Sequence, residues 1–242
     1  MKRFLAIILV IVISATSLFS CAPDVQSPGN DNTDTYGVGA CDYAKERDTV
    51  GRIVTYVEMC IYNYGKIVFC LDHTAAPASV AQFVGLANGG YYSDPPEGST
   101  NVYGNRIHAI SPGAYIHGGC HAGNGSGTLN QKIHGEFLDN GFKNNDISHR
   151  RGVISFARED NYDSASCQFF ICYTDMTELD GHYAAFGYIV EGMSVLDAIM
   201  NDLSQYADGE SFILPEEYQP KIKYVRLYEE WYLERGQYLA NL

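Results

Sequence analysis

The stretch ASCQFFICYTDMTELDGHYAAFG, residues 165–187, contains two predicted strands joined by a polar connection. Successive side chains of a strand point to opposite faces, so Gln168 and Phe170 share one face while Phe169 lies on the other. The letters LDGH are typical of a turn, and YAAFG is expected to return as a strand. We therefore expect one face of this strand pair to be core and the other to be a site, with the phenol of Tyr183 above the ring of Phe170.

The segments DSASCQFFI and LDGHYAAFG resemble the cyclophilin family of peptidyl-prolyl cis-trans isomerases, whose usual sequences at these places are close to DSATSQFFI and LDGxYAVFG. Four other segments agree with that family: NYGKIVFCLDHTAAPASVAQFVGLANGGYY, GEF, HRRGVISFAR and QPKIKYVRL. The resemblance covers residues 53–228, which we expect to form one cyclophilin-like domain. It implies a mainly β fold, a closed eight-stranded antiparallel barrel capped by two α-helices. The alternative is a pair of core strands in an unrelated β protein, because hydrophobic alternation alone is generic.

The hydrophobic pattern agrees with this architecture. Residues 53–72 read as a hairpin, IVTYVEMCIY and KIVFCLD around the turn NYG. Residues 77–88 are expected to form a helix that ends at a Gly-Gly pair and buries Val80, Phe83, Val84 and Ala87. A second helix is expected to open at Ser194, with Asp197 completing a capping box, and to bury Val195, Leu196, Ile199 and Met200.

The N-terminus has the pattern of an export signal. Residues 1–20 carry two positive charges, an apolar run and then small residues before Cys21, and LFSC resembles a bacterial lipobox. A retained transmembrane anchor is the alternative, although the apolar run is short for a bilayer. Residues 21–52 are rich in Pro, Gly, Asn, Asp and Thr and are expected to be a flexible tether. We therefore expect an extracytoplasmic domain, lipid-anchored to a bacterial membrane through Cys21, with residues 229–242 as a C-terminal extension of unassigned role.

The charge balance excludes one class of partner. The chain has 16 Lys and Arg and 29 Asp and Glu, and removal of residues 1–20 takes away Lys2 and Arg3, leaving 14 − 29 = −15. Such a balance argues against a nucleic-acid backbone as partner. We expect a monomer that has no cofactor and no metal, and whose partners are Pro-containing peptides or unfolded proteins.

Six cysteines remain beyond the lipidation site: Cys41, Cys60, Cys70, Cys120, Cys167 and Cys172. An even set outside the cytoplasm is compatible with disulfides, but the spacing matches no known framework. Cys167 and Cys172 would be about 17 Å apart on one strand, too far to bond to each other. Cys60 and Cys70 flank the NYG turn and could form a disulfide across the hairpin.

The resemblance implies catalysis of rotation about X-Pro peptide bonds, whose barrier is roughly 18–20 kcal/mol. A site for this reaction must hold the proline ring, anchor the flanking backbone and favour the twisted amide. The apolar contacts are expected from Phe170, Leu179 and Tyr183. Polar contacts are expected from Gln168, which can bond a peptide carbonyl or amide, and from further residues that the resemblance assigns to the substrate: Ala157 and Arg158 through their backbone, Gly125 and His108.

One position departs from the family. The family's catalytic arginine lies in a motif that corresponds to IHAISPGAYIHGG here, and registering on Pro-Gly and Gly-Gly leaves Ala109 in its place. Arg106 is three residues away, an odd step, and would leave a regular strand from the opposite face, although a bulge could invert that. Ala114 replaces a family phenylalanine. Tyr115 and His117, at the positions of a usual Met and Gln, are expected to share a face and line the groove.

Three functional hypotheses follow. The first is an isomerase that acts on X-Pro bonds of exported or envelope proteins, with reduced activity because of Ala109. The second is a non-catalytic module that binds Pro-containing peptides. The third is a metal site built from the dense cluster His108, His117, His121 and Cys120.

Other conspicuous features have simpler interpretations. The remaining histidines, His73, His134, His149 and His182, are expected to have surface or structural roles. The loop GNGSG at residues 123–127 lacks the flanking strand and helix of a phosphate cradle, and the resemblance makes it a groove-lining loop. Residues 93–102 lengthen a loop beside the groove, as a partner-selecting element or a tolerated insertion.

Overall fold

The computed structural model describes residues 46–47, 51–100 and 103–228. The expected signal peptide, the lipidation site Cys21, most of the tether and the extension 229–242 lie outside the described residues. Among the residues described, no helix has both the length and the apolar content needed to cross a bilayer.

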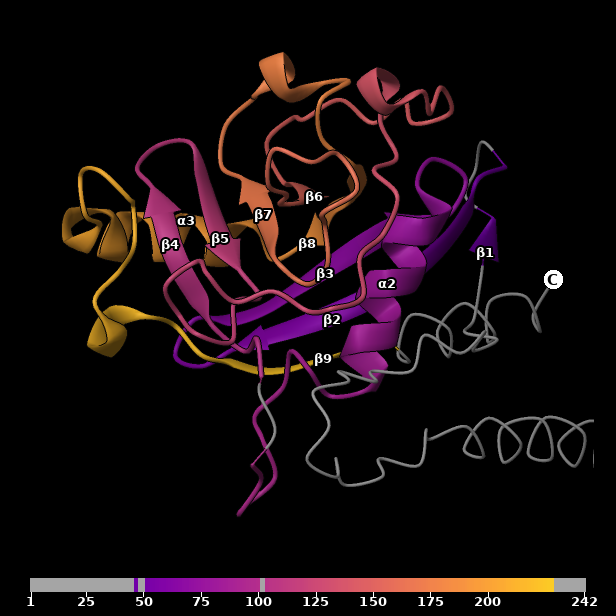
Figure 1. The fold of residues 1–242 in the computed structure, drawn as a ribbon. Coiled ribbons are helices and arrows are strands. Elements are labelled where there is room, and N and C mark those ends of the chain that lie inside the picture. The colour runs from indigo at the N-terminus through magenta and orange to yellow at the C-terminus, as the bar shows by residue number, and fades with distance from the viewer. Residues whose placement is uncertain (1–45, 48–50, 101–102, 229–242) are drawn as a thin grey trace, which may run out of the picture.

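The strands form one antiparallel sheet (Figure 1). A path of eight strands runs in the order β9-β2-β3-β8-β6-β7-β5-β4, and the two-residue strand β1 also pairs with β2. The bounds are β1 Glu46–Arg47, β2 Ile53–Ile61, β3 Gly65–Asp72, β4 Ile107–Ser111, β5 Tyr115–Gly118, β6 Val153–Phe156, β7 Phe169–Cys172, β8 Ala185–Glu191 and β9 Ile222–Leu227. The mainly β, antiparallel architecture expected from the sequence, with eight strands along one path, is therefore confirmed.

The sheet is curled but open, so the prediction of a closed barrel is wrong. Closure would require β4 and β9, the two ends of the path, to pair along their length. In the described residues they meet through one isolated bridge, Arg106 with Lys221, and adjacent hydrogen bonds such as Ile107 N to Pro220 O, 3.0 Å. The loop before β9 pairs with β4 through the isolated bridge of Ala109 with Ile213, in place of a continuous ladder between β4 and β9.

Two α-helices cover the curled sheet, as expected, and lie on opposite sides of the strands (Figure 1). Helix α2 spans Pro77–Asn88, the predicted range, because proline suits the first turn of a helix and Gly90 adopts a positive φ after its end. The short 3-10 helices are η2 Leu138–Asn140, η3 Thr177–Leu179, η4 Ser204–Tyr206 and η5 Glu216–Tyr218. Both α-helices contribute to one apolar core with the inner faces of the strands.

Helix α3 spans Met193–Leu203, and the capping box predicted at its start is wrong. Gly192 precedes the helix at φ 87°, and a Cβ there would lie 2.2 Å from Lys66 O, so the turn requires glycine. Ser194 lies inside the helix, and Asp197 forms an ion pair with Arg151. The apolar face was predicted correctly, since Val195, Leu196, Ile199 and Met200 are buried.

The β2–β3 hairpin forms as expected, but the disulfide considered across it is wrong. Cys60 lies opposite Lys66, whereas Cys70 lies opposite Tyr56. The two cysteines are therefore offset by four residues (60 − 56 = 4), roughly 13 Å along the strands, and Cys60 has a free thiol.

Candidate active site

The two faces of β7 pack into separate clusters, and the prediction that one of them belongs to the core is confirmed. Phe169 is fully buried in the main core, between the inner faces of the strands and α2. Phe170 belongs to a second, smaller apolar cluster with Val153, Cys172 and Ala185 on the opposite face of the sheet. The ring of Phe170 thus lies outside the main core, as a substrate-binding floor requires.

A single row of residues crosses four strands on this second face. Ala109 of β4 pairs with His117 of β5, His117 pairs with Phe170 of β7, and Phe170 pairs with Ser155 of β6. Directly opposed residues of an antiparallel pair share a face. Ala109 therefore lies two strands from Phe170, roughly 10 Å away, and its side chain projects from the face that carries the Phe170 ring. We call these four residues the catalytic row.

A β-bulge at His108 sets this geometry. The register shifts between Ile107 and Ala109, so that His108 and Ala109 together oppose His117. The rings of His108 and His117 are 4.5 Å apart between centroids. Burial, with a further contribution from His117, lowers the pKa of His108 to about 3, and burial lowers the pKa of His117 to about 4, so both rings are neutral at physiological pH.

Aromatic and aliphatic side chains pack around the Phe170 ring. Tyr183 meets it edge-to-face with centroids 5.7 Å apart, which confirms the predicted proximity of the two rings. Tyr115 lies 5.8 Å away, on the same face as His117, as expected. Leu179 is a partly buried member of the same cluster. Tyr115, Leu179 and Tyr183 are partly buried around the buried Phe170 ring and form the apolar surface of this cluster.

His149 is a contributor that sequence reasoning placed only among surface or structural histidines. Its buried ring stacks on Phe170, with centroids 5.9 Å apart and 12° between the planes. Asp180 Oδ1 lies 2.9 Å from Nδ1, and Ser155 Oγ lies 3.1 Å from Nε2. The signal was its place within HRRGVISF directly before β6, which the sequence alone could not pair with Phe170.

The amide of Gln168 is oriented by the loop GNGSG at residues 123–127, which we call the glycine loop. Its Nε2 donates to Gly125 O at 2.9 Å and to Gly127 O at 2.7 Å. Both N–H groups are therefore used, and the side-chain oxygen is the atom left for a substrate. In this arrangement Gln168 can accept from a peptide N–H, while the expected bond to a peptide carbonyl is not available.

The other predicted substrate contacts lie beside this group. Ala157 donates its backbone N–H to Gln168 O at 2.9 Å. The guanidinium of Arg158 lies over the Tyr183 ring, 4.6 Å from its centroid, and donates to His182 O. Arg158 thus packs on the face of the Tyr183 ring.

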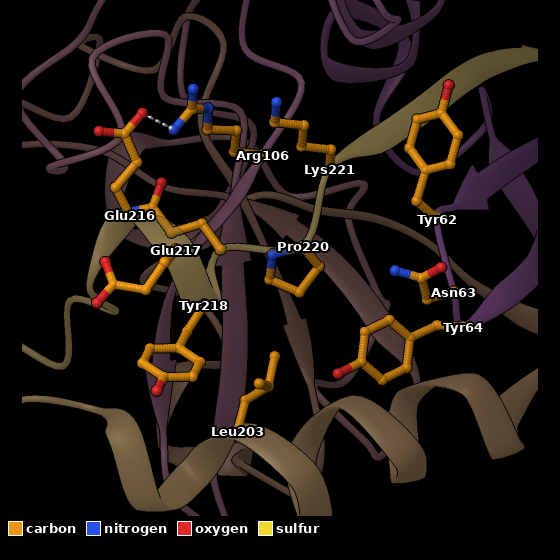
Figure 2. Close-up of a pocket in the computed structure, with 11 residues that line it drawn as sticks. Tyr62, Asn63, Tyr64, Arg106, Leu203, Glu216, Glu217, Tyr218, Pro220 and Lys221 are labelled. Atoms are coloured by element: carbon orange, nitrogen blue, oxygen red, sulfur yellow. Dashed lines mark hydrogen bonds and ion pairs between the residues drawn. The ribbon is translucent and has the colours of Figure 1, made fainter.

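The bulge at His108 lies between Arg106 and Ala109, so the regular strand assumed for Arg106 does not hold, and its side chain forms an ion pair with Glu216. Nη1 of Arg106 bonds Glu216 Oε1 at 2.9 Å, and its side chain lines a pocket of about 550 Å³ at the end of the sheet (Figure 2). Tyr62, Tyr64 and Tyr218 are among the other lining residues, and no member of the catalytic row is among them. We call it the tyrosine pocket. The described part of the loop 93–102 is anchored on this side too, through a bond from Asp94 N to Lys223 O, 3.0 Å.

The metal hypothesis receives no support from the arrangement of ligands. Within the described part of the chain, no group of three or more His, Cys, Asp or Glu side chains is placed to hold a metal ion. His108 and His117 lie together, but the sheet does not add the third ligand that the hypothesis needed from His121 or Cys120.

An aromatic cluster on the outer face of a curled antiparallel sheet, an oriented amide beside it and two covering helices are the features that the cyclophilin resemblance implied. The model of the family described as "Cyclophilin type peptidyl-prolyl cis-trans isomerase/CLD" matches residues 56–217. This chain belongs to that family.

Similar proteins agree in sequence and in fold. A peptidyl-prolyl cis-trans isomerase of Helicobacter pylori (strain ATCC 700392 / 26695) is 37% identical over 139 residues, 57% of this chain and 76% of the relative. Peptidyl-prolyl cis-trans isomerase A of Dickeya dadantii is 36% identical over 141 residues, 56% of this chain and 66% of the relative. The crystal structure of a Cryptosporidium parvum cyclophilin, determined in the presence of the dipeptide Ala-Pro, superposes with a TM-score of 0.58. It covers 72% of this chain and 98% of its own at 24% identity, a likeness of fold.

Proposed function

We propose that this chain is a peptidyl-prolyl cis-trans isomerase of exported or envelope proteins. Its family is that of the cyclophilin-type isomerases, and the relatives compared above are named peptidyl-prolyl cis-trans isomerases. The observation that carries the proposal is the isolation of Phe170 from the main core, within a ring of aromatic side chains that faces the same side as position 109.

The site residues would act without a covalent intermediate. The apolar surface of Phe170, Tyr115, Tyr183 and Leu179 would hold the prolyl ring, while Gln168 Oε1 accepts an N–H of the flanking backbone. Holding both sides of the X-Pro bond lowers the barrier only if the contacts are better for the twisted amide than for either planar form. Water is excluded by the same rings, which strengthens the polar contacts that remain.

Ala109 limits the rate in this proposal. The sequence resemblance assigns Ala109 to the position of the family's arginine, and what supports the proposal is that Ala109 shares a face with Phe170 while Arg106 is bonded to Glu216. The loss of one charge-assisted donor at a transition state typically costs about 100-fold or more. A module that binds Pro-containing peptides without turnover is the second candidate, and Ala109 is the observation that favours it.

The proposed substrates follow from the N-terminal sequence. The lipobox-like LFSC would make Cys21 the lipidated first residue of the mature chain and hold the domain outside the cytoplasm. Mass spectrometry of the mature N-terminus, compared with a Cys21→Ala variant, tests this part. A mature chain with an unmodified Cys21, or one cleaved elsewhere, would overturn the lipid anchor and leave the isomerase proposal standing.

The isomerase proposal is tested by NMR exchange spectroscopy on a Pro-containing tetrapeptide. We expect measurable catalysis by the wild type and its loss in Phe170→Ala. The control is Val190→Ala, because Val190 is an exposed apolar residue of β8 outside the Phe170 cluster. Binding of the peptide without exchange would select the non-catalytic module. Neither binding nor exchange, in a protein shown to be folded, would remove both candidates.

A further inference from the structure

The loop that precedes β9 forms a second pocket directly beside the catalytic row. The pocket has a volume of about 430 Å³, within the range of ligand-binding pockets. One wall comes from the glycine loop and the other from the segment before β9, and the lining residues are Arg106, His121, Ala122, Gly123, Asn124, Ile213, Leu214, Glu216 and Gln219. We call it the Gln219 pocket.

The segment that lines the pocket makes backbone contacts with β4, beside the candidate active site. Ile213 forms an isolated antiparallel bridge with Ala109, and Leu214 N donates to His108 O at 2.9 Å. A Cβ built on Gly125 would lie 3.7 Å from Ile213 Cδ1. Ile213 and Gly125 therefore form a rim between the pocket and the candidate active site, because Ile213 adjoins Ala109 and Gly125 accepts from Gln168.

Gln219 gives this pocket an acceptor that nothing in the described structure uses. The side chain is 8% exposed, and its Nε2 donates to Gly123 O at 2.7 Å and to Leu214 O at 2.8 Å, joining the two walls. Its Oε1 is buried and has no hydrogen-bond partner. That oxygen lies 2.8 Å from where a Cβ of residue 123 would be, so a side chain at Gly123 would cover it. A buried acceptor left unpaired costs about 1–3 kcal/mol, which a ligand N–H would recover.

The remaining polar groups of the pocket favour a peptide main chain as ligand. Arg106 is a donor, and its charge is balanced by Glu216 at 2.9 Å, so the pocket carries no net charge for an ion. Figure 2 shows this ion pair, which also lines the neighbouring tyrosine pocket. Paired donors and acceptors without net charge match the N–H and C=O of an extended peptide.

We propose that the Gln219 pocket binds the main chain of a substrate segment that flanks the X-Pro bond on one side. This inference rests on the proposed isomerase function and specifies its substrate class: extended, unfolded polypeptide in place of short Pro-containing peptides. Because the prolyl ring is fixed in the Phe170 slot, only one of the two flanking segments can cross the rim of Ile213 and Gly125. The pocket therefore discriminates between the two directions of extension.

The test uses the full mature chain and three peptides: a Pro-containing tetrapeptide and two octapeptides that extend it with four alanines on either the N-terminal or the C-terminal side. We expect one octapeptide, and only one, to bind at least fivefold more tightly than the tetrapeptide by calorimetry. N-methylation of the alanines in that octapeptide removes its donors and should abolish the gain.

Two matched variants localise the effect. Ala122→Trp places an indole in the Gln219 pocket, and Asn201→Trp places the same group on the exposed side of α3. Ala122→Trp should lose the gain from extension, while Asn201→Trp should retain it. Equal gains for both octapeptides, no gain for either, or a gain that survives in Ala122→Trp would each overturn the proposal. Failure of the wild type to bind or isomerise the tetrapeptide would instead be a failure of the proposed function.

Discussion

Replacement of Ala109 by arginine should raise the isomerisation rate, and the register of the sheet gives the reason. Ala109 lies roughly 10 Å from Phe170 across β5, on the same face. An arginine side chain extends roughly 6–7 Å from its Cα at ordinary bond lengths. A guanidinium from position 109 can therefore pass over His117 and reach the edge of the Phe170 ring, where the nitrogen of a bound prolyl residue would lie.

The expected gain follows from what one such donor contributes. Removing a single donor to a developing charge costs about 2.7–4 kcal/mol, or about 10²–10³-fold in rate. Position 109 is 3% exposed, so part of this gain is offset by the strain of placing a longer side chain beside Ile213. We therefore expect Ala109→Arg to increase kcat on the tetrapeptide by about 100-fold, equivalent to about 2.7 kcal/mol.

The control separates the donor from the bulk of the new side chain. Ala109→Met has an unbranched side chain without a donor, and it should leave kcat close to the wild-type value. Both variants are compared by NMR exchange, with thermal unfolding to establish that each is folded. A folded Ala109→Arg protein with no gain would refute the register argument, and equal gains for Arg and Met would show that the filling of space, and not the donor, is responsible.

Three further predictions concern buried polar groups. Burial lowers the pKa of His108 to about 3, against 6.5 in the unfolded chain. The stability that the neutral His108 ring contributes is therefore fully present above pH 6.5 and is lost as the pH falls toward 3. Urea unfolding should show a loss between pH 7.5 and pH 5 that is about 2 kcal/mol larger in the wild type than in His108→Gln, because the buried His117 contributes a loss of its own in both proteins; equal losses would contradict the assignment. Glu136→Ala should cost about 2–3 kcal/mol by urea unfolding, because its buried carboxylate accepts from Ala78 N and Ser79 N at 2.8 Å and so caps α2; an unchanged midpoint would exclude that cap. His149→Ala should raise KM for the tetrapeptide severalfold more than it lowers kcat, since the stacked Phe170 floor loses its support; unaltered kinetics would refute a positioning role.

Local signals in the sequence were sufficient for elements whose ends are fixed by their own residues. Helix α2 begins at Pro77 and ends at the Gly-Gly pair as predicted, because both boundaries depend on backbone preferences of single residues. The start of α3 was missed because Asp197 has a distant partner, Arg151, that outweighs a local capping box. The open edge between β4 and β9 likewise depends on a loop whose path no periodicity describes.

The candidate site was also predicted only in part from the sequence. Strand alternation was enough to place Phe170 opposite Phe169 and to put Tyr115 and His117 on one face. It could not reveal the bulge at His108, which changes the face of the residues just before it, Ile107 and Arg106. Nor could it pair His149 with Phe170, since that contact joins segments whose relative placement is decided by the whole sheet.

Ala109 and the Gln219 pocket have different kinetic consequences, although Ile213 is adjacent to both. Contacts to a flanking main chain are made equally in the ground state and in the twisted transition state. Such uniform binding raises kcat/KM and leaves kcat unchanged, whereas a donor to the prolyl nitrogen acts in the transition state and raises kcat. Extension of the peptide should therefore lower KM at constant kcat in the wild type, and Ala109→Arg should raise kcat on short and long peptides alike. If extension raised kcat instead, the pocket would be acting on the twisted amide itself, and the division of roles between the two sides of Ile213 would be wrong.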